Sequence, residues 1–327
     1  MERLKALLEI TTADGIDFDT AAELADIDDE EIFELAEAAN NIRRRFRGDK
    51  ADLCSIVNAR SGRCQEDCHF CSQSDHYDCD IETSEMVTSD KILSKAKQAE
   101  DLGADRFCIV TSGDSLSRDD FKVVMEALSR MKDETLLKRC ASLGRLNKDQ
   151  VASLVDAGLN RYHHNIETAR SFYPKICTTH DYDERLRTIR NIKDAGIECC
   201  VGGILNLGES TEQRIEFAFE LKEIGPDSVP INFLDPRRGT PLYGRPPMDA
   251  LEAVKFIAIF RLIMPTTIIR LAAGRCETLG KYQKLGISAG VDGLLIGDYL
   301  TTKGPDLKRD IEALESIGFK VERDDRL

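Results

Sequence analysis

Three cysteines, Cys64, Cys68 and Cys71, lie within a short stretch at the spacing C-x3-C-x2-C. A tight loop with this spacing directs three thiolates toward one point, where they bind three irons of a 4Fe–4S cluster and leave the fourth iron open. An open coordination position lets a metal centre bind a substrate or cofactor, whereas protein ligands fill every position of a structural site. The alternatives are a zinc site with His69 as its fourth ligand, or three unrelated core thiols. The clustering of the cysteines in one loop favours the iron–sulfur site.

Composition bounds the class of protein. The 327 residues are 42% hydrophobic and 32% charged, which is enough apolar material for a large buried core. A net charge of −14 argues against a nucleic-acid partner, because such binders need a basic surface. The most apolar stretch, 254–264, is too short to span a bilayer, and no secretory signal is visible, so we expect a cytoplasmic protein without a membrane partner. In that reducing compartment, the 11 cysteines favour metal binding or catalysis over disulfides.

From about residue 52, short β-rich runs alternate with amphipathic stretches. The expected strands cover 53–58, 106–111, 137–143, 161–167, 198–205, 228–234, 267–271 and 293–296. The expected helices lie near 89–102, 118–132, 147–157, 181–195, 211–224, 249–263, 277–286 and 305–317. This alternation predicts an α/β fold, a (β/α)8 TIM-type barrel, with a doubly wound open sheet as the alternative.

The region before the barrel is expected to be helical. Apolar residues recur at helical spacing over 21–44, so we predict an N-terminal helical extension over residues 1–48. The barrel is then expected over 49–320 and a C-terminal tail over 321–327. A basic run follows the helical stretch and consists of Arg43, Arg44, Arg45, Arg47 and Lys50. We expect this run to be a solvated face, and docking of an acidic electron donor is the alternative.

The cysteine motif resembles that of the radical S-adenosylmethionine enzymes, in which an aromatic residue precedes the third cysteine, as Phe70 does here. Other segments resemble the biotin synthase family over about residues 52–305. The segments that carry this resemblance are 106–109, 140–144, 162–168, 200–204, 228–232, 239–241, 270–275, 297–298 and 301–302, together with Glu209.

The resemblance implies a sulfurtransferase of biotin biosynthesis. In such enzymes the open iron binds S-adenosylmethionine, which one electron cleaves to methionine and a 5′-deoxyadenosyl radical. This radical abstracts hydrogen from the methyl group of dethiobiotin, and a sulfide of an auxiliary iron–sulfur cluster traps the carbon radical. A second S-adenosylmethionine repeats the abstraction and closes the ring of biotin. The implied reductant is an acidic electron donor such as flavodoxin or ferredoxin.

Four further residues point to the auxiliary cluster. Cys108, Cys140, Cys200 and Arg270 fall within four different expected strands, and alternation of side chains lets one residue from each strand point into the barrel. By resemblance, these positions match the three cysteines and one arginine that hold a 2Fe–2S cluster in biotin synthases. The nearby Cys276 leaves the nuclearity of the cluster and its fourth ligand open.

The remaining cysteines have simpler expected roles. Cys199 adjoins Cys200 and should therefore point to the opposite side of its strand, toward the helices. Cys54 and Cys177 are interpreted as packing residues.

The resemblance also assigns ligand contacts. It places Phe70, Asn165, Glu167 and Glu209 at S-adenosylmethionine, although Glu167 stands where the family usually has aspartate. Asn165 and Asn232 carry amide donors and acceptors that suit the ureido ring of dethiobiotin. Its carboxylate is assigned to Thr301 and Thr302. The alternative for both asparagines is a strand-end polar group that hydrogen-bonds to the backbone.

Two other functions remain as alternatives. One is a radical enzyme of the hydrogenase-maturation type on the same scaffold, which would not need the three barrel cysteines and Arg270. The other is a non-catalytic iron–sulfur or metal-binding protein, which would not take up S-adenosylmethionine. The sequence leaves the oligomeric state open, with a homodimer as one option.

Overall fold

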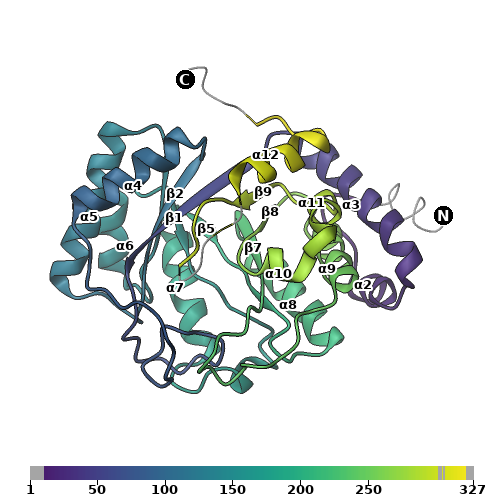
Figure 1. Cartoon of the computed structure of the whole chain (residues 1–327), viewed down its shortest axis with the longest axis horizontal. Coiled ribbons are helices and arrows are strands. Elements are labelled where there is room, and N and C mark those ends of the chain that lie inside the picture. Colours follow the sequence, from purple (N-terminus) through teal and green to yellow (C-terminus); the bar gives the residue numbers. More distant parts are fainter. Residues whose placement is uncertain (1–10, 301–303, 305, 322–327) are drawn as a thin grey trace.

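The computed structural model describes residues 11–300, 304 and 306–321. In this part of the chain, nine parallel strand segments form one closed sheet that helices surround (Figure 1). They are β1 (Asp52–Arg60), β2 (Arg106–Thr111), β3 (Lys138–Ser142), β4 (Arg161–His163), β5 (Glu198–Cys200), β6 (Gly203–Leu205), β7 (Ser228–Phe233), β8 (Ile268–Leu271) and β9 (Gly293–Leu295). The strands follow the order β5-β4-β3-β2-β1-β9-β8-β7-β6, and β5 also pairs with β7, so the two ends of the sheet meet and it closes on itself. The predicted barrel is confirmed, and the open-sheet alternative is wrong.

The fifth strand position of the barrel is split into β5 and β6, whereas the sequence predicts one strand over 198–205. Both segments pair with β7, but the ladder is interrupted between Cys200 and Gly203. The interruption lies opposite Pro230 of β7. Proline has no backbone N–H to donate to a neighbouring strand. The barrel therefore has eight strand positions although nine segments pair.

Polar residues cap most of the helices that follow the strands, but not the two short helices that begin after Gly274 and Tyr282. The helices are α4 (Ser89–Asp101), α5 (Arg118–Glu134), α6 (Lys148–Asp156), α7 (Tyr182–Asp194), α8 (Thr211–Ile224), α9 (Ala250–Ile263), α10 (Arg275–Leu279), α11 (Gln283–Ser288) and α12 (Leu307–Ser316). The side chain before the helix accepts a backbone hydrogen bond at Thr88, Ser117, Asn147, Asp181, Ser210, Asp249 and Asp306. These caps fix where each helix starts relative to the loop that precedes it.

Two predicted helical stretches are broken. The stretch over 21–44 forms two helices, α2 (Phe18–Ala25) and α3 (Ile32–Arg47), because the backbone at Asp28 is extended at φ −69° and ψ 156°. The stretch over 277–286 is divided between α10 and α11, because Gly280 has a φ of 48° and ends α10. In both places the apolar spacing continues across the break, so periodicity alone does not reveal it.

The apolar segment over 254–264 belongs to α9, which α2 and α3 cover on the outside of the barrel (Figure 1). Its two basic residues bind other elements. Lys255 Nζ donates to the Ala25 carbonyl at the end of α2 (3.1 Å), and Arg261 pairs with Asp292. Among the described helices, none is long and apolar enough to cross a membrane.

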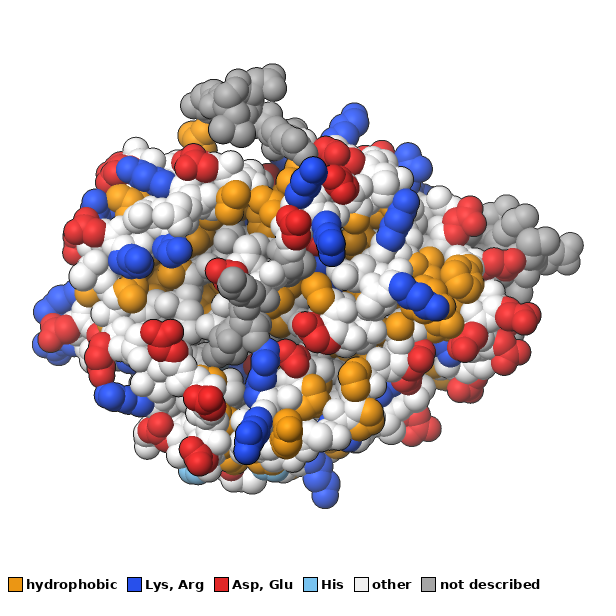
Figure 2. Space-filling model, in the orientation of Figure 1, with side chains coloured by type: hydrophobic (Ala, Val, Ile, Leu, Met, Phe, Trp, Pro, Cys, Tyr) orange, Lys and Arg blue, Asp and Glu red, His pale blue; other side chains and the backbone are white. Residues whose placement is uncertain are grey.

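The basic run, which covers the last turns of α3 and Lys50, is not simply a solvated face. Arg43 is fully buried, and its guanidinium lies 4.1 Å from the centre of the Phe319 ring. Arg47 Nε lies 3.5 Å from Asp292 Oδ1. The expected solvated face is therefore wrong for Arg43, which joins the helical extension to the barrel. On the face that Figure 2 shows, acidic and basic side chains are interspersed rather than gathered in one basic tract.

Candidate active site

A cavity of about 450 Å³ extends from the loops at the carboxyl ends of the strands into the barrel. Active sites of (β/α)8 enzymes form at this end of the barrel. Most of the residues that the sequence singles out line this cavity. They are Cys64, Cys68, Phe70, Cys71, Cys108, Cys140, Asn165, Glu167, Cys200, Asn232 and Arg270. The fold thus brings together in one space residues that are far apart in the sequence.

The loop after β1 presents Cys64, Cys68 and Cys71 to the cavity, and backbone hydrogen bonds shape it. Cys71 N donates to the Cys68 carbonyl (2.9 Å), and Cys64 N donates to the Gln73 carbonyl (3.0 Å). The loop is anchored to the chain after β2 by the Ser112 hydroxyl, which donates to the Gly62 carbonyl at 2.7 Å. The three thiols are therefore held by a turn that is complete without a metal.

Burial favours the protonated form of two of the loop thiols. It raises the pKa of Cys71 to about 11 and raises that of Cys64 as well. A metal centre replaces such protons and supplies the positive charge that the thiolates need. Three cavity-facing thiols are the donor set that a 4Fe–4S cluster with one open iron requires. His69 is not among the cavity-lining residues, so the alternative zinc site loses its expected fourth ligand.

A second group of cysteines lines the cavity deeper in the barrel. Cys108 on β2 and Cys140 on β3 are direct neighbours in the strand register, and Cys200 on β5 is the register partner of His163. A hydrogen bond between the first two thiols raises the pKa of Cys108 and lowers that of Cys140. Strand alternation thus brings these side chains to the barrel interior, as expected from their positions.

Arg270 shares this inner part of the cavity and forms an ion pair with Asp52. Burial by itself opposes the charge on Arg270, but the Asp52 carboxylate together with Cys54 and Cys200 outweighs burial and holds the arginine pKa above its ordinary value. The same pair lowers the pKa of Asp52 to about 2 despite burial. Arg270 is therefore a charged ion-pair partner here, and ligation of iron would require its guanidinium to lose a proton.

Two further arginines surround the inner cysteines, and sequence reasoning missed them. Arg106 and Arg161 are buried and line the cavity. Among the described residues, Arg106 Nε and Nη1, Arg161 Nη1 and Arg270 Nε have no hydrogen-bond partner. Unpaired buried donors are rare, and here they fit an anionic group held between the strands. The sequence could have revealed Arg106, because it precedes Cys108 by two residues and so lies on the same side of β2.

Cys54 was also missed, and its interpretation as a packing residue is incomplete. It is buried on β1, but it lines the cavity and is the register partner of Arg106. Two other cysteines behave differently. Cys199 is not among the cavity-lining residues, in line with the expected alternation. Cys276 is also absent from the lining, and its Sγ lies 3.8 Å from Gln283 Oε1.

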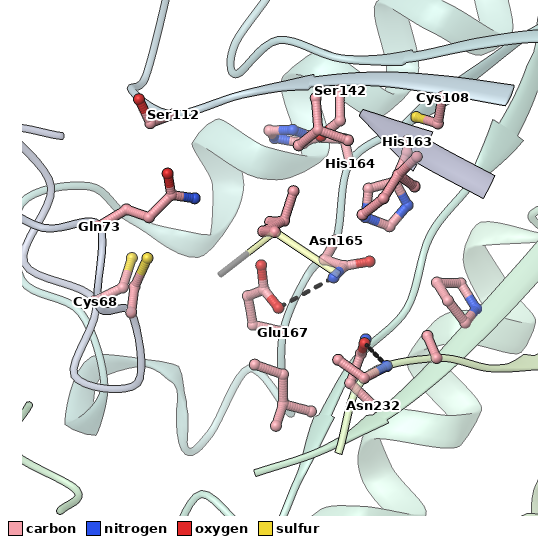
Figure 3. Close-up of a pocket in the computed structure, with 18 of the residues that line it drawn as sticks. Cys68, Gln73, Cys108, Ser112, Ser142, His163, His164, Asn165, Glu167 and Asn232 are labelled. Atoms are coloured by element: carbon pink, nitrogen blue, oxygen red, sulfur yellow. Dashed lines mark hydrogen bonds between the residues drawn. The ribbon is translucent and has the colours of Figure 1, made fainter. Parts of the chain in front are cut away.

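The side chains that are predicted to contact S-adenosylmethionine and dethiobiotin face the space between the two cysteine groups. Figure 3 shows Asn165 beside Glu167, and Asn165 Nδ2 donates to Glu167 Oε2 at 3.2 Å. Glu167 has a φ of 69°, which is uncommon outside glycine and directs its carboxylate toward the cavity. Arg185, which sequence reasoning missed, donates to the Asn165 carbonyl (3.0 Å) and lies 3.6 Å from the Glu167 carboxylate.

Asn232 lines the cavity while both ends of its amide bind the backbone (Figure 3). Its Nδ2 donates to the Gly203 carbonyl (3.0 Å), and its Oδ1 accepts from Ala273 N (3.0 Å). Asn232 therefore also acts as a strand-end polar group that hydrogen-bonds to the backbone, which was the alternative interpretation. One amide hydrogen and part of the oxygen remain for a ligand.

Comparison with known proteins places these observations in a family. Residues 59–221 match the model of the Radical SAM superfamily, and residues 230–320 match that of the Biotin and Thiamin Synthesis associated domain. The chain is 45% identical over 321 residues to the biotin synthase of Pelotomaculum thermopropionicum, and 98% of each chain is covered. It is 47% identical over 303 residues to that of Carboxydothermus hydrogenoformans, with 92% of this chain and 93% of the relative covered. The chain belongs to the biotin synthase family.

Solved structures of more distant proteins share the fold. Methylornithine synthase (PylB) superposes with a TM-score of 0.84 at 20% identity and covers 98% of this chain and 97% of its own. The hydrogenase maturase HydG superposes with a TM-score of 0.80 at 16% identity, covering 97% of this chain and 74% of its own. At these identities, the likeness concerns the barrel alone.

Membership of the biotin synthase family makes the chain a radical S-adenosylmethionine enzyme. The superfamily implies S-adenosylmethionine and a 4Fe–4S cluster, and the thiols of Cys64, Cys68 and Cys71 fit that cluster. The family name also implies an auxiliary cluster.

Glu209, which was predicted to contact S-adenosylmethionine, lies outside the cavity lining. It is buried but does not line the cavity. Its carboxylate accepts hydrogen bonds from Asn206 N (2.7 Å), Gly208 N (2.9 Å) and Arg214 Nε (2.7 Å). These contacts use the carboxylate to hold the turn between β6 and α8, and contact of Glu209 with S-adenosylmethionine stays a prediction. Thr301 and Thr302 lie outside the described residues.

Proposed function

We propose that this protein forms biotin by inserting sulfur into dethiobiotin. The observation that carries the proposal is a single cavity lined by two separate cysteine groups, one on the loop after β1 and one on the barrel strands. A radical enzyme needs a site that makes the radical, and sulfur insertion needs a second site that supplies sulfur. The two cysteine groups supply donors for both proposed sites in one cavity, which supports the proposal.

In this proposal, Cys64, Cys68 and Cys71 hold the 4Fe–4S cluster. When bound, the cluster and S-adenosylmethionine supply a 5′-deoxyadenosyl radical that abstracts hydrogen from an unactivated C–H bond. Phe70, Asn165 and Glu167 are proposed contacts of S-adenosylmethionine. Asn165 and Glu167 already share a hydrogen bond, so their side chains are oriented before the ligand arrives.

Cys108, Cys140, Cys200 and Arg270 are the proposed ligands of the auxiliary cluster, which in the family is 2Fe–2S and serves as the sulfur source. The charges of Arg106, Arg161 and Arg270 support this location, because thiolates and sulfide make the bound group anionic. Cys276, which is not among the cavity-lining residues, is disfavoured as the fourth ligand. A structure of the anaerobic protein tests this choice: a guanidinium nitrogen about 2.0–2.4 Å from iron supports Arg270.

Dethiobiotin is proposed to lie between the two groups. Asn165 and Asn232 face this space with amide groups that match the ureido ring in kind. For its carboxylate, Thr301 and Thr302 remain the proposed partners. A substrate bound inside the barrel would be shielded from water, which protects a carbon radical from side reactions. An acidic protein such as flavodoxin or ferredoxin is the proposed electron donor, and a homodimer is a proposed assembly.

The test is an anaerobic incubation of the reconstituted protein with dethiobiotin, S-adenosylmethionine and a low-potential reductant. The proposal predicts both 5′-deoxyadenosine and biotin from the parent protein. It predicts 5′-deoxyadenosine without biotin from Cys200→Ala. A different radical enzyme would form 5′-deoxyadenosine without biotin in the parent as well. A non-catalytic iron–sulfur protein would form neither product.

A further inference from the structure

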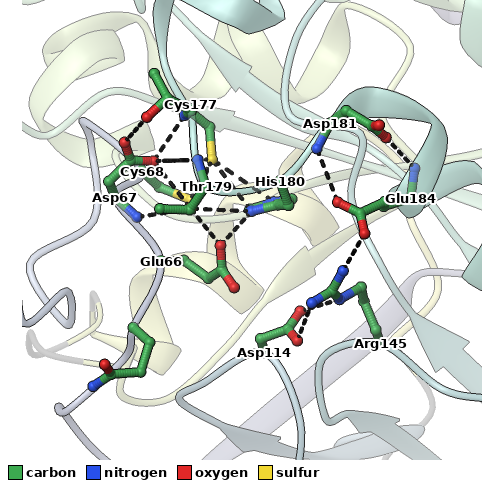
Figure 4. Close-up of polar contacts among 12 residues, drawn as sticks. Glu66, Asp67, Cys68, Asp114, Arg145, Cys177, Thr179, His180, Asp181 and Glu184 are labelled. Carbon is green, nitrogen blue, oxygen red and sulfur yellow. Dashed lines mark hydrogen bonds and ion pairs between the residues drawn. The ribbon is translucent and has the colours of Figure 1, made fainter.

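Behind the loop after β1, a cysteine and a histidine outside the proposed cluster ligands face Cys68. Cys177 Sγ lies 3.9 Å from Cys68 Sγ and 3.3 Å from His180 Nδ1 (Figure 4). All three residues are buried, and their ligand atoms lie within 4.8 Å of one another. Packing explains the burial of Cys177 but not this convergence of two thiols and an imidazole. We call Cys68, Cys177 and His180 the Cys–Cys–His group.

The spacing of the Cys–Cys–His group suits a tetrahedral metal ion. With metal–sulfur distances of about 2.3 Å and metal–nitrogen distances of about 2.0–2.1 Å, ligand atoms in a tetrahedron lie about 3.4–3.8 Å apart. The observed separations of 3.9 Å and 3.3 Å lie close to these values. Glu66 offers a fourth ligand: its Oε2 shares a hydrogen bond with His180 Nδ1 at 2.6 Å (Figure 4), and the two atoms must move apart by about 0.8 Å when an ion takes the place of the shared proton.

The other nitrogen of His180 is already fixed in the way that metal-bound histidines require. His180 Nε2 lies 2.8 Å from the Tyr173 hydroxyl, which accepts a hydrogen bond from Arg185 Nε at 2.6 Å. This contact orients the ring so that Nδ1 faces the two thiols. Outer-shell bonds of this kind set the tautomer and orientation of metal-bound histidines.

Asp67 joins the two segments that carry the Cys–Cys–His group. Its carboxylate accepts from Thr178 N at 2.8 Å and from Thr179 N at 3.2 Å. Cys177 Sγ also lies 3.3 Å from the same carboxylate oxygen. The loop that carries Cys68 is therefore tied to the segment that carries Cys177, and the ligand atoms keep their relative positions without a metal.

We propose that the cluster-free protein binds one borderline-soft divalent cation, Zn²⁺ or Fe²⁺, through Cys68, Cys177 and His180, with Glu66 completing the shell. Thiol and imidazole protons leave as the cation enters, so the charge of the ion replaces theirs. In the usual order of divalent affinities, Zn²⁺ binds such a site more tightly than Fe²⁺. Because Cys68 is also a proposed ligand of the 4Fe–4S cluster, which rests on the proposed function, the cation and the cluster exclude each other.

The site is tested with full-length protein that is stripped of iron and reduced under anaerobic conditions. Co²⁺ is titrated as a spectroscopic probe and then displaced by Zn²⁺ or Fe²⁺. The parent should bind one Co²⁺ with tetrahedral d–d bands and thiolate charge transfer. Cys177→Ser and His180→Gln should each weaken binding by at least about tenfold. Cys199→Ser, which changes a buried cysteine outside the cavity, should bind as the parent does, and circular dichroism checks that each variant folds.

The cysteine set distinguishes this site from a metal held by the three loop cysteines. The proposal predicts that Cys64→Ala and Cys71→Ala still bind Co²⁺ with parent affinity. If these two variants lose the metal while Cys177→Ser keeps it, the proposal is overturned. Parent-like binding by both Cys177→Ser and His180→Gln would overturn it equally.

A second measurement tests the competition with the cluster. Protein preloaded with Zn²⁺ is reconstituted with iron and sulfide, and cluster content is followed over time. Zn²⁺ should slow cluster formation in the parent but not in Cys177→Ser. Equal slowing in both proteins would contradict competition at this site. Failure of the proposed function would show separately, as a full cluster content in Cys68→Ala.

Discussion

The two cysteine groups of the cavity are positioned by different means. Cys64, Cys68 and Cys71 lie on one loop whose own backbone hydrogen bonds hold it. The inner group, by contrast, comes from separate strands and depends on barrel closure for its geometry. The loop group has acidic neighbours such as Glu66, whereas the inner group is surrounded by arginines. In the proposed function, a local turn thus holds the cluster that leaves one iron open, and the barrel wall holds the cluster that supplies sulfur.

The largest expected effect comes from breaking the loop group. Cys68→Ala should abolish 5′-deoxyadenosine formation, because each thiolate is one of only three protein ligands of the 4Fe–4S cluster. The barrel and the inner cluster should remain, so iron content should fall by about four per chain. Product analysis and iron content check this outcome. Continued reductive cleavage of S-adenosylmethionine by this variant would refute the assignment.

Breaking the inner group should separate the two activities. Cys140→Ala or Cys200→Ala should abolish biotin formation but retain 5′-deoxyadenosine formation, because the radical-forming ligands lie in a different loop. Chromatography of both products from one anaerobic reaction measures the ratio. Cys199→Ser serves as a matched control, because Cys199 is buried in the same strand but absent from the cavity lining. Parent rates of biotin formation in both alanine variants would exclude the sulfur-donor role.

A smaller effect is expected between the two groups, at Asn232. Asn232→Ala should weaken dethiobiotin binding by about tenfold, equivalent to about 1.4 kcal/mol, and leave S-adenosylmethionine binding nearly unchanged. Calorimetric titration with each ligand separates the two effects. The loss of its bonds to Gly203 and Ala273 should also lower thermal stability. Asn232→Asp keeps the acceptor for Ala273 N, and so controls for that structural part. Equal losses for both ligands would contradict a substrate contact.

The smallest effect on activity is expected at Glu209, at the edge of the cavity. Glu209→Gln should lower the free energy of unfolding by about 2 kcal/mol, because it removes the buried partner of Arg214 Nε and leaves Arg214 paired only with the partly exposed Glu252. Its affinity for S-adenosylmethionine should change less than about threefold, since the carboxylate is absent from the cavity lining. Denaturant unfolding and ligand titration measure the two quantities. The exposed Glu212→Gln is the control, with a stability change within about 0.5 kcal/mol.

The sequence predicts the barrel well because its signals are local. Strand and helix alternation, and the loop cysteines, are each visible in a short window. The break between β5 and β6 is not, because it depends on Pro230 in a different strand. The burial of Arg43 likewise depends on Phe319, which is remote in the sequence.

The same limit applies to the site. The inner cysteines are predicted through strand alternation and family resemblance, but the arginines around them were passed over although they follow the same alternation. Cys177 and His180 are separated from Cys68 by more than a hundred residues, and no pattern in the sequence links them. The turn contacts of Glu209 are not predictable either, because a carboxylate that holds a turn and one that holds a ligand look alike in sequence.

The most direct test of the two-site account is a Mössbauer spectrum of ⁵⁷Fe-reconstituted anaerobic protein with and without S-adenosylmethionine. We predict two iron populations, of which only one changes when S-adenosylmethionine is added. That population should be missing in Cys68→Ala, and the other should be missing in Cys140→Ala. A single population, or a change confined to the iron that Cys140→Ala removes, would contradict the account.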